Sequence, residues 1–296
     1  MIKTIIRYVA ISPLYVFNKC MDIVSLLSMS FKRISRDYQL MHSDNLIEKI
    51  THISANNKRI DMSFYTPNSL CMYRAETFSD KEPETLAWIE EFGCNNATLF
   101  DIGANIGLYS IYHNKINNGK CIAFEPSFFN LKLLAKNINV NNCQHLTTVI
   151  TNPLSSETRL SNFKYGSTVE GGALSAFGVD FGYDGEKIQN NMQLNVLGVS
   201  LDWMFESQII DVVPNLVKID VDGIEHIVLQ GAKKILEHVN CKSVLVEVND
   251  AFKEQSDKVA ILLESFDFIL RGKFQGDLTN KSDLFSDTFN QIWVKK

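Results

Sequence analysis

Two acidic residues, each placed directly after a short apolar run, are the residues of this chain that most clearly indicate chemistry. Asp101 follows the run 97–100, and Glu125 follows the run 121–124. Apolar runs of this length bounded by turn residues predict buried strands. A glycine-bearing loop and the start of a helix lie between them. This order of strand, glycine loop, helix and strand is typical of α/β proteins that bind nucleotide-like cofactors.

The loop residues Gly103, Ala104, Asn105 and Gly107 are predicted to contact such a cofactor. Glycines let the backbone approach a ligand, and the following helix offers free N–H groups to an anion. The spacing is not G-x-G-x-x-G, and a carboxylate at Asp101 would repel a pyrophosphate. S-Adenosylmethionine fits better, because its ammonium and sulfonium groups would be attracted by Asp101 and its carboxylate by the loop.

Glu125 lies roughly twenty residues beyond the glycine loop, where an acid at the end of a second strand accepts the ribose hydroxyls of a cofactor. Pro126 ends this strand and is included among the predicted cofactor contacts. The alternative is that Asp101 and Glu125 only cap helices and turns. It is less favoured, because both features occur together.

Two long segments of the chain resemble the FkbM family of S-adenosylmethionine-dependent methyltransferases. They are FDIGANIGLYS…GKCIAFEPSFFNLKLLAKNINVNN and LVKIDVDGIEHIVLQGAKKIL, followed by SVLVEV, and the match covers about Glu82 to Val248. The resemblance implies an α/β, Rossmann-like class I methyltransferase fold: a mostly parallel seven-stranded sheet with helices on both faces. We expect an N-terminal helical and short-strand extension at 1–80 and the methyltransferase domain at 81–296.

Several further acids are predicted to lie at the carboxyl ends of strands, where open α/β sheets bind ligands. Asp220 and Asp222 follow the fourth core strand, and Glu247 lies near the end of the fifth. Asp220, beside Lys218, is predicted to be a cofactor-side or structural acid. The resemblance places Asn152, after the third strand, near the adenine. Upstream of the first core strand, Tyr73, Arg74 and Glu84 can also reach the cofactor, although a helix-start ion pair explains them nearly as well.

The predicted reaction is in-line transfer of the sulfonium methyl group to an oxygen nucleophile, with alignment as the main contribution of the protein. A hydroxyl also needs a proton acceptor; the candidates are Asp222, Glu225, His226 and Glu247. We predict no metal, although Asp220, Asp222 and Glu225 form the alternative of a Mg²⁺ site. The resemblance implies a glycan or a small-molecule hydroxyl as the acceptor.

Two other classes of function compete with methyl transfer. An NAD-dependent oxidoreductase or epimerase would bind NADH and not S-adenosylmethionine; the G-x-x-x-G spacing and Asp101 count against it. A non-catalytic partner protein with the same fold would show no turnover, and changing Asp222 or Glu247 would have little effect.

The insert at about 155–200 is predicted to contain two strands on either side of a glycine-rich segment with Phe177, Phe181 and Tyr183. Such an insert beside a cofactor site is typical of a mobile substrate lid. A disordered surface loop is the alternative.

Composition and the N-terminus bear on partners and location. The net charge of −5 and the lack of a basic run disfavour nucleic acid. Six scattered cysteines without C-x-x-C indicate a reducing cytoplasm. Residues 1–35 are apolar but interrupted by charges and Pro13, which argues against a membrane span or a signal peptide. We expect helices that pack on the domain; an interfacial helix at the inner membrane face is the alternative. Residues 36–50 are predicted to form another helix.

Overall fold

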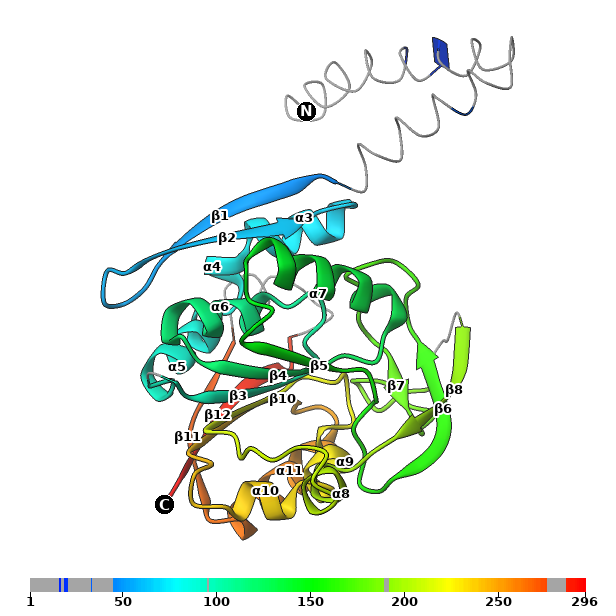
Figure 1. Ribbon diagram of the computed structural model, residues 1–296. Coiled ribbons are helices and arrows are strands. Elements are labelled where there is room, and N and C mark those ends of the chain that lie inside the picture. The colour runs from blue at the N-terminus through cyan, green and yellow to red at the C-terminus, as the bar shows by residue number, and fades with distance from the viewer. Residues whose placement is uncertain are drawn as a thin grey trace. The chain divides into compact units, whose positions relative to one another are not determined.

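The structure is a computed structural model that describes residues 45–94, 96–188, 192–275 and 286–296, together with Val16, Lys19, Cys20 and Arg33. The chain divides into two compact units, Met1–Leu46 and Ile47–Lys296 (Figure 1). Apart from those four single positions, the predictions for residues 1–35 lie outside the described residues. Within the described part of the chain, no helix has the length and apolar character needed to cross a membrane.

A seven-stranded sheet lies at the centre of the second unit, with the strand order β11-β12-β10-β9-β3-β4-β5. Strand β12 runs antiparallel to both of its neighbours, and the other described pairings are parallel. This confirms the predicted Rossmann-like, mostly parallel sheet with a closing antiparallel pair. The strands are β3 (Thr98–Ile102), β4 (Lys120–Phe124), β5 (Thr147–Ile150), β9 (Leu216–Ile219), β10 (Ser243–Asn249), β11 (Phe268–Phe274) and β12 (Thr288–Lys295).

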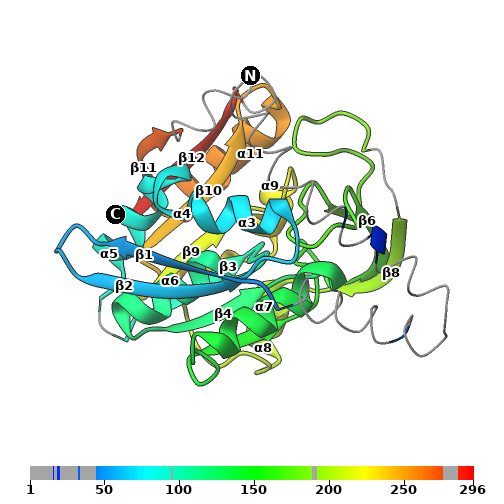
Figure 2. The ribbon, with the colours of Figure 1, turned by 90° about the horizontal axis from the view of Figure 1, so that it is seen from above.

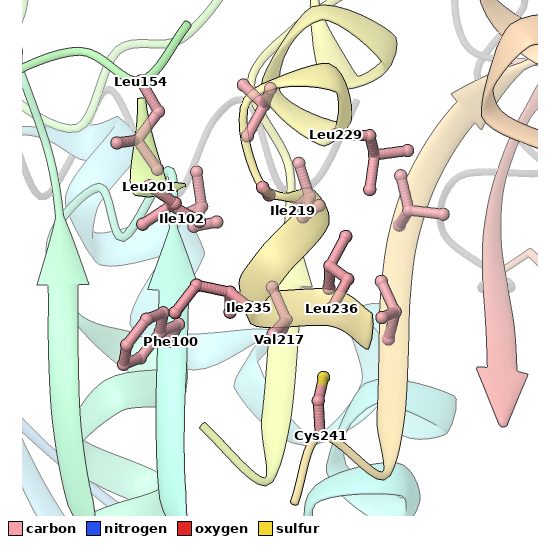
Figure 3. Close-up of a cluster of buried hydrophobic side chains, with 14 of the residues drawn as sticks. Phe100, Ile102, Leu154, Leu201, Val217, Ile219, Leu229, Ile235, Leu236 and Cys241 are labelled. Carbon is pink, nitrogen blue, oxygen red and sulfur yellow. The ribbon is translucent and has the colours of Figure 1, made fainter. Parts of the chain in front are cut away.

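Helices cover both faces of this sheet, as predicted (Figure 1). Successive side chains of a strand point to opposite faces, so Leu99 packs with the helices of one face while Phe100 and Ile102 pack with those of the other. Figure 3 shows this second cluster, in which Ile235 and Leu236 lie against β3 and β9. One face carries α5 (Pro83–Phe92), α6 (Leu108–Asn117) and α7 (Phe128–Val140), and the other carries α8 (Leu201–Glu206), α9 (Glu225–Gln230), α10 (Lys233–Glu237) and α11 (Lys253–Ser265).

The segment before α5 contains a hairpin and two short helices: β1 (Ile47–Ile53), β2 (Arg59–Tyr65), α3 (Ser69–Glu76) and α4 (Phe78–Lys81). Asn57, between the two strands of the hairpin, has φ +58°. The helix predicted for 36–50 is wrong from Ile47 onward, where β1 begins. Leu46 and Ile50 are four residues apart, a spacing that fits a helix and equally fits alternate positions of a strand. Pairing with β2 decides between the two.

The insert forms a separate three-stranded antiparallel sheet of β6 (Arg159–Tyr165), β7 (Ala176–Phe177) and β8 (Met192–Gly198). Both predicted strands are therefore present. Phe163, Tyr165 and Phe177 are buried together with Ile224. Figure 2 shows α3 alongside the loops of this insert. The insert thus has a packed core of its own beside the carboxyl ends of the central strands, and its role as a moving lid stays a prediction.

One buried hydrogen-bond chain ties α5 to the sheet and gives a test of stability. The indole N–H of Trp88 donates to Ser243 Oγ at 2.8 Å, and Ser243 Oγ donates to the carbonyl of Trp293 at 2.7 Å. Ser243→Ala leaves the buried indole N–H unpaired, so we expect the free energy of unfolding to fall by about 1–3 kcal/mol. Urea titration measures this loss. The matched change Ser265→Ala, at the exposed end of α11, should cost less than about 0.5 kcal/mol; equal losses would contradict the assignment.

Candidate active site

A cavity of about 470 Å³ opens at the carboxyl ends of the central strands. It brings together most of the residues predicted for the site: Gly103, Ala104, Asn105, Glu125, Pro126, Asn152, Asp220, Asp222 and Glu247. Four predicted residues do not line it: Asp101, Gly107, Glu225 and His226. The strand-end principle therefore located the cavity correctly, and the four exceptions have separate physical reasons.

The glycine loop is shaped by close backbone contacts. Gly103 has φ +85°, and a Cβ built there would lie 1.8 Å from the carbonyl oxygen of Asp220. This position therefore requires glycine, because the end of β9 approaches the loop directly. Gly107 has φ +89° and precedes the first residue of α6, and a Cβ there would lie 2.6 Å from Leu134. Gly107 thus allows α6 and α7 to pack closely and does not face the ligand.

The carboxylate of Glu125 is fixed in the cavity by two backbone donors. Its Oε2 accepts from the N–H of Asn105 and its Oε1 from the N–H of Ser127, both at 2.7 Å. Burial raises the pKa of Glu125 to about 8, although these N–H groups act in the opposite sense. Each oxygen retains a lone pair for a further donor. Glu125 is therefore oriented to accept two hydroxyl groups, as predicted for a ribose.

Asp101 is buried and faces away from the cavity, so the prediction that it contacts the cofactor is corrected. Its Oδ2 accepts from Ser110 Oγ on α6 at 2.5 Å, and its Oδ1 has no partner within the described part of the chain. Burial raises the pKa of Asp101, against the effect of Lys218. The physical reason is the hydrogen bond from α6, which holds the short side chain of Asp101 under that helix, whereas the longer side chain of Lys218, its partner on β9, reaches the cavity. Asp101 ties α6 to β3.

A buried cluster of charges forms the floor of the cavity around Lys218, which is 1% exposed. Lys218 Nζ lies 2.7 Å from Asp220 Oδ2. Glu82 accepts from Tyr109 OH at 2.8 Å and from Lys81 Nζ at 2.5 Å. Burial would lower the pKa of Lys218, but the surrounding acids raise it above its usual range. Lys218 therefore stays charged and supports carboxylates at this end of the sheet.

Glu82 is a cavity residue that the sequence prediction missed. Burial opposes its ionisation, but the nearby Lys81 and Lys218 lower its pKa to about 2. Glu82 precedes α5 and follows no strand, so the strand-end argument could not find it. The sequence signal was the segment Glu82-Pro83-Glu84-Thr85, which Glu82 itself begins. The other acid of this segment, Glu84, accepts from Asn290 Nδ2 at 2.8 Å.

Asp222 and Glu247 both line the cavity, but they differ in protonation. Asp222 has φ +58°, and its Oδ2 accepts from the N–H of Leu174 at 2.6 Å. Burial and the charge of Asp220 raise the pKa of Asp222 to about 6. The same two causes raise the pKa of Glu247 well above its usual range. At neutral pH, Asp222 is mostly ionised, whereas burial and the neighbouring acids favour the protonated form of Glu247.

Glu225 and His226 lie outside the cavity, and their predicted catalytic roles are corrected. The carboxylate of Glu225 accepts from the backbone N–H groups of Val221 and Gly223, at 3.0 and 3.1 Å. It therefore holds the turn that carries Asp222 and does not complete the alternative Mg²⁺ site. His226 is buried edge-on against Phe252, and burial lowers its pKa to about 4. Both side chains belong to the first turn of α9, which directs them beneath the turn that carries Asp222.

The opposite end of the cavity is mainly apolar. Phe124, Leu154, Phe163 and Phe177 line it. Asn152 also lines the cavity, and its Nδ2 donates to the carbonyl of Leu197 on β8 at 2.8 Å, which leaves Oδ1 toward other donors. A flat heterocycle with an exocyclic amino group fits this combination. On the other side, α3 and α4 contribute Leu70, Tyr73, Arg74, Phe78 and Lys81.

Comparison with known proteins gives one family and several similar folds. A family model described as the Methyltransferase FkbM domain matches residues 101–271. No curated protein matches the chain. A solved methyltransferase FkbM from Methylobacillus flagellatus KT is 14% identical with a TM-score of 0.46, covering 67% of this chain and 43% of that one, so this chain spans less than half of its length.

Two other solved structures have comparable scores. A putative rRNA methylase from Clostridium thermocellum is 13% identical with a TM-score of 0.44, covering 73% of this chain and 96% of that one. Fibrillarin from Aeropyrum pernix, in complex with natively bound S-adenosyl-L-methionine, is 9% identical with a TM-score of 0.41, covering 69% and 68%.

The raised pKa of Glu125 gives a test of its contact with a cofactor ribose. The ionised carboxylate is the form that accepts two hydroxyls, and below pH 8 the free protein holds a proton there. Binding of S-adenosylhomocysteine should therefore release a proton, and its affinity should rise by up to about tenfold per pH unit between pH 6 and 8. Calorimetry in buffers of different ionisation enthalpy measures both effects.

The variant Glu125→Gln should lose this pH dependence and weaken binding by about 1.5–3 kcal/mol. Glu264→Gln, on the exposed side of α11, serves as the control and should behave as the parent protein. A Glu125→Gln protein with full affinity would remove this residue from the site.

Proposed function

This chain belongs to the FkbM family of S-adenosylmethionine-dependent methyltransferases, and from that membership we propose that it methylates a hydroxyl of a sugar or a related small molecule. The observation that carries the proposal is the composition of one cavity. Its cofactor half contains the glycine loop and Glu125, and its other half contains the carboxyl groups of Asp222 and Glu247. A methyl donor and a hydroxyl acceptor need these two halves side by side.

The cofactor half fits S-adenosylmethionine, which supplies a methyl group made electrophilic by the sulfonium. Glu125 would accept the ribose hydroxyls, and Gly103 has no side chain to obstruct the approach of the ligand. The apolar end, with Phe163 and Phe177, would hold the adenine. Asn105 Oδ1 is buried without a partner among the described residues, and so it can accept from a ligand donor. These residues position and align the donor.

The acceptor half favours a ligand rich in hydroxyl groups. Gln275, Thr288 and Asn290 line it with side chains that both donate and accept hydrogen bonds. Tyr73 and Phe289 add aromatic faces that can pack on the C–H face of a sugar ring. The hydroxyl of Thr288 is buried without a partner within the described part of the chain, which leaves it available to such a ligand.

We assign proton transfer to Asp222 and acceptor orientation to Glu247. A general base works best with a pKa near the working pH and in its ionised form. Asp222 meets both conditions, because its pKa is about 6. The hydrogen bond from Leu174 occupies one lone pair and leaves others for the acceptor hydroxyl. Protonated Glu247 can donate to an oxygen of the acceptor.

We place this activity in the cytoplasm. All six cysteines are free thiols, and Cys71, Cys121, Cys143 and Cys241 are buried. Free buried thiols are typical of a reducing compartment and support this setting. The acceptor would then be a metabolite or a glycan precursor available in that compartment.

A pH profile tests the assignment of the base. With a panel of sugars as acceptors and detection of S-adenosylhomocysteine, kcat/KM should rise through about pH 6 to a plateau as Asp222 ionises. Asp222→Asn should abolish this rise and lower kcat by about 10²-fold or more, with little change in S-adenosylhomocysteine affinity. Glu247→Gln, a neutral analogue of the protonated acid, should keep the rise near pH 6.

The competing functions predict other results in the same assay. An oxidoreductase would bind NADH and ignore S-adenosylmethionine. A non-catalytic protein would show no turnover with any acceptor, and Asp222→Asn would behave as the parent protein. If Asp222→Asn keeps full activity while Glu247→Gln loses it, the base assignment is wrong.

A further inference from the structure

Arg74 brings a positive charge into the cavity from α3, outside the residues that the family model matches. Its Nε donates to the carbonyl oxygen of Gly171 at 2.8 Å, which fixes the orientation of the guanidinium. No ion pair of the described residues includes Arg74. Since a guanidinium has five N–H donors, its two terminal nitrogens remain available to a ligand. Arg74 is therefore an oriented cation whose nearest effect on an acid of the cavity is a lowering of the pKa of Asp222, without an ion pair among the described residues.

Asn105 offers the complementary group, a hydrogen-bond acceptor. It is held by the carbonyl group next to the one that holds Arg74. Its Nδ2 donates to the carbonyl of Gly172 at 3.0 Å, and this leaves Oδ1 buried without a partner among the described residues. Gly171 and Gly172 are consecutive, with Cα atoms about 3.8 Å apart. Arg74 and Asn105 therefore hold adjacent carbonyl groups of one short strip, one residue offering donors and the other an acceptor.

The strip Glu170–Gly172 that joins them is itself firmly held. Asn68 Nδ2 donates to the carbonyl of Glu170 at 3.0 Å, and Asn130 Oδ1 accepts from the N–H of Gly171 at 2.9 Å. Gly171 has φ +79°, and a Cβ there would lie 2.8 Å from Cys71 Sγ. The views agree that α3 lies beside the insert (Figures 1 and 2). The relative positions of Arg74 and Asn105 are thus set before any ligand binds.

We propose that Arg74 and Asn105 together bind an α-amino-acid zwitterion, the methionine end of the cofactor. The guanidinium takes the carboxylate, and Asn105 Oδ1 accepts from the ammonium. A planar fork of donors matches the two oxygens of a carboxylate, and such charge-assisted bonds are among the stronger ones in proteins. This inference rests on the proposed use of S-adenosylmethionine and assigns part of its recognition to the segment before the family domain.

The test compares two ligands that differ only at the proposed point of contact. S-Adenosylhomocysteine carries the amino-acid end, and 5′-methylthioadenosine keeps the nucleoside and thioether but lacks it. Calorimetry on the full chain should show that Arg74→Gln lowers affinity for S-adenosylhomocysteine by about tenfold or more. Affinity for 5′-methylthioadenosine should stay within about twofold. Arg74→Lys, which keeps the charge without the fork, should fall between Arg74→Gln and the parent protein.

Arg271→Gln is the matched control, because Arg271 pairs with Glu91 on the surface at 2.5 Å and does not line the cavity. It should change neither affinity. Melting temperatures show which variants fold, and Arg74→Lys gives the comparison if Arg74→Gln does not.

Two outcomes overturn the inference. Equal losses for both ligands would mean that Arg74 only supports the Gly171 strip. No loss of affinity for either ligand would mean that Arg74 does not bind the methionine carboxylate and that its anionic partner belongs to an acidic acceptor. A parent protein that fails to bind S-adenosylhomocysteine would instead contradict the proposed function.

Discussion

The buried ammonium group of Lys218 is the interaction on which the rest of the site depends. A buried charge is costly unless it is paired, and so is each carboxylate placed near it. Lys218 lies among Asp101, Asp220 and Glu82. These acids lower the cost of burying its charge, and its charge in turn favours the ionised forms of Asp101 and Glu82. Because this cation compensates their charge, the acids at the ends of the central strands can be buried in a sheet that helices cover on both faces. The charges of the cavity therefore come from Lys218 and the acids around it, and the same group stabilises the junction of β3, β9 and α6.

The same environment separates the protonation states of neighbouring carboxyl groups. Glu82 lies beside two lysines and stays ionised, whereas burial and other acids raise the pKa of Glu247 and favour its protonated form. Asp222 lies between these extremes. Burial and the charges around each carboxyl group, and not residue type, therefore separate their pKa values. A single cavity can in this way both orient and deprotonate a hydroxyl.

Local sequence patterns were sufficient for the sheet, the glycine loop and Glu125, because short apolar runs and the loop encode their own geometry. They were insufficient for Asp101, whose direction depends on which helix covers that face of β3. The predictions for Glu225 and His226 failed for a related reason, since the first turn of α9 directs both side chains below the turn that carries Asp222. Glu82 lies before the first core strand, and only tertiary packing brings it to the cavity. The first part of strand β1 was predicted as helix because its apolar spacing also fits a helix.

The firmly held strip Glu170–Gly172 divides the insert into parts with different freedom to vary. The strip is tied to α3, α7 and the glycine loop through its own backbone atoms, so that side-chain identity within it matters little beyond the glycines. Past Ser175, the chain enters the small sheet at β7, and Phe177 there lines the apolar end of the cavity. Side-chain changes in the strip that keep its glycines would therefore leave this backbone framework intact, whereas changes at Phe177 would alter the apolar end of the cavity itself.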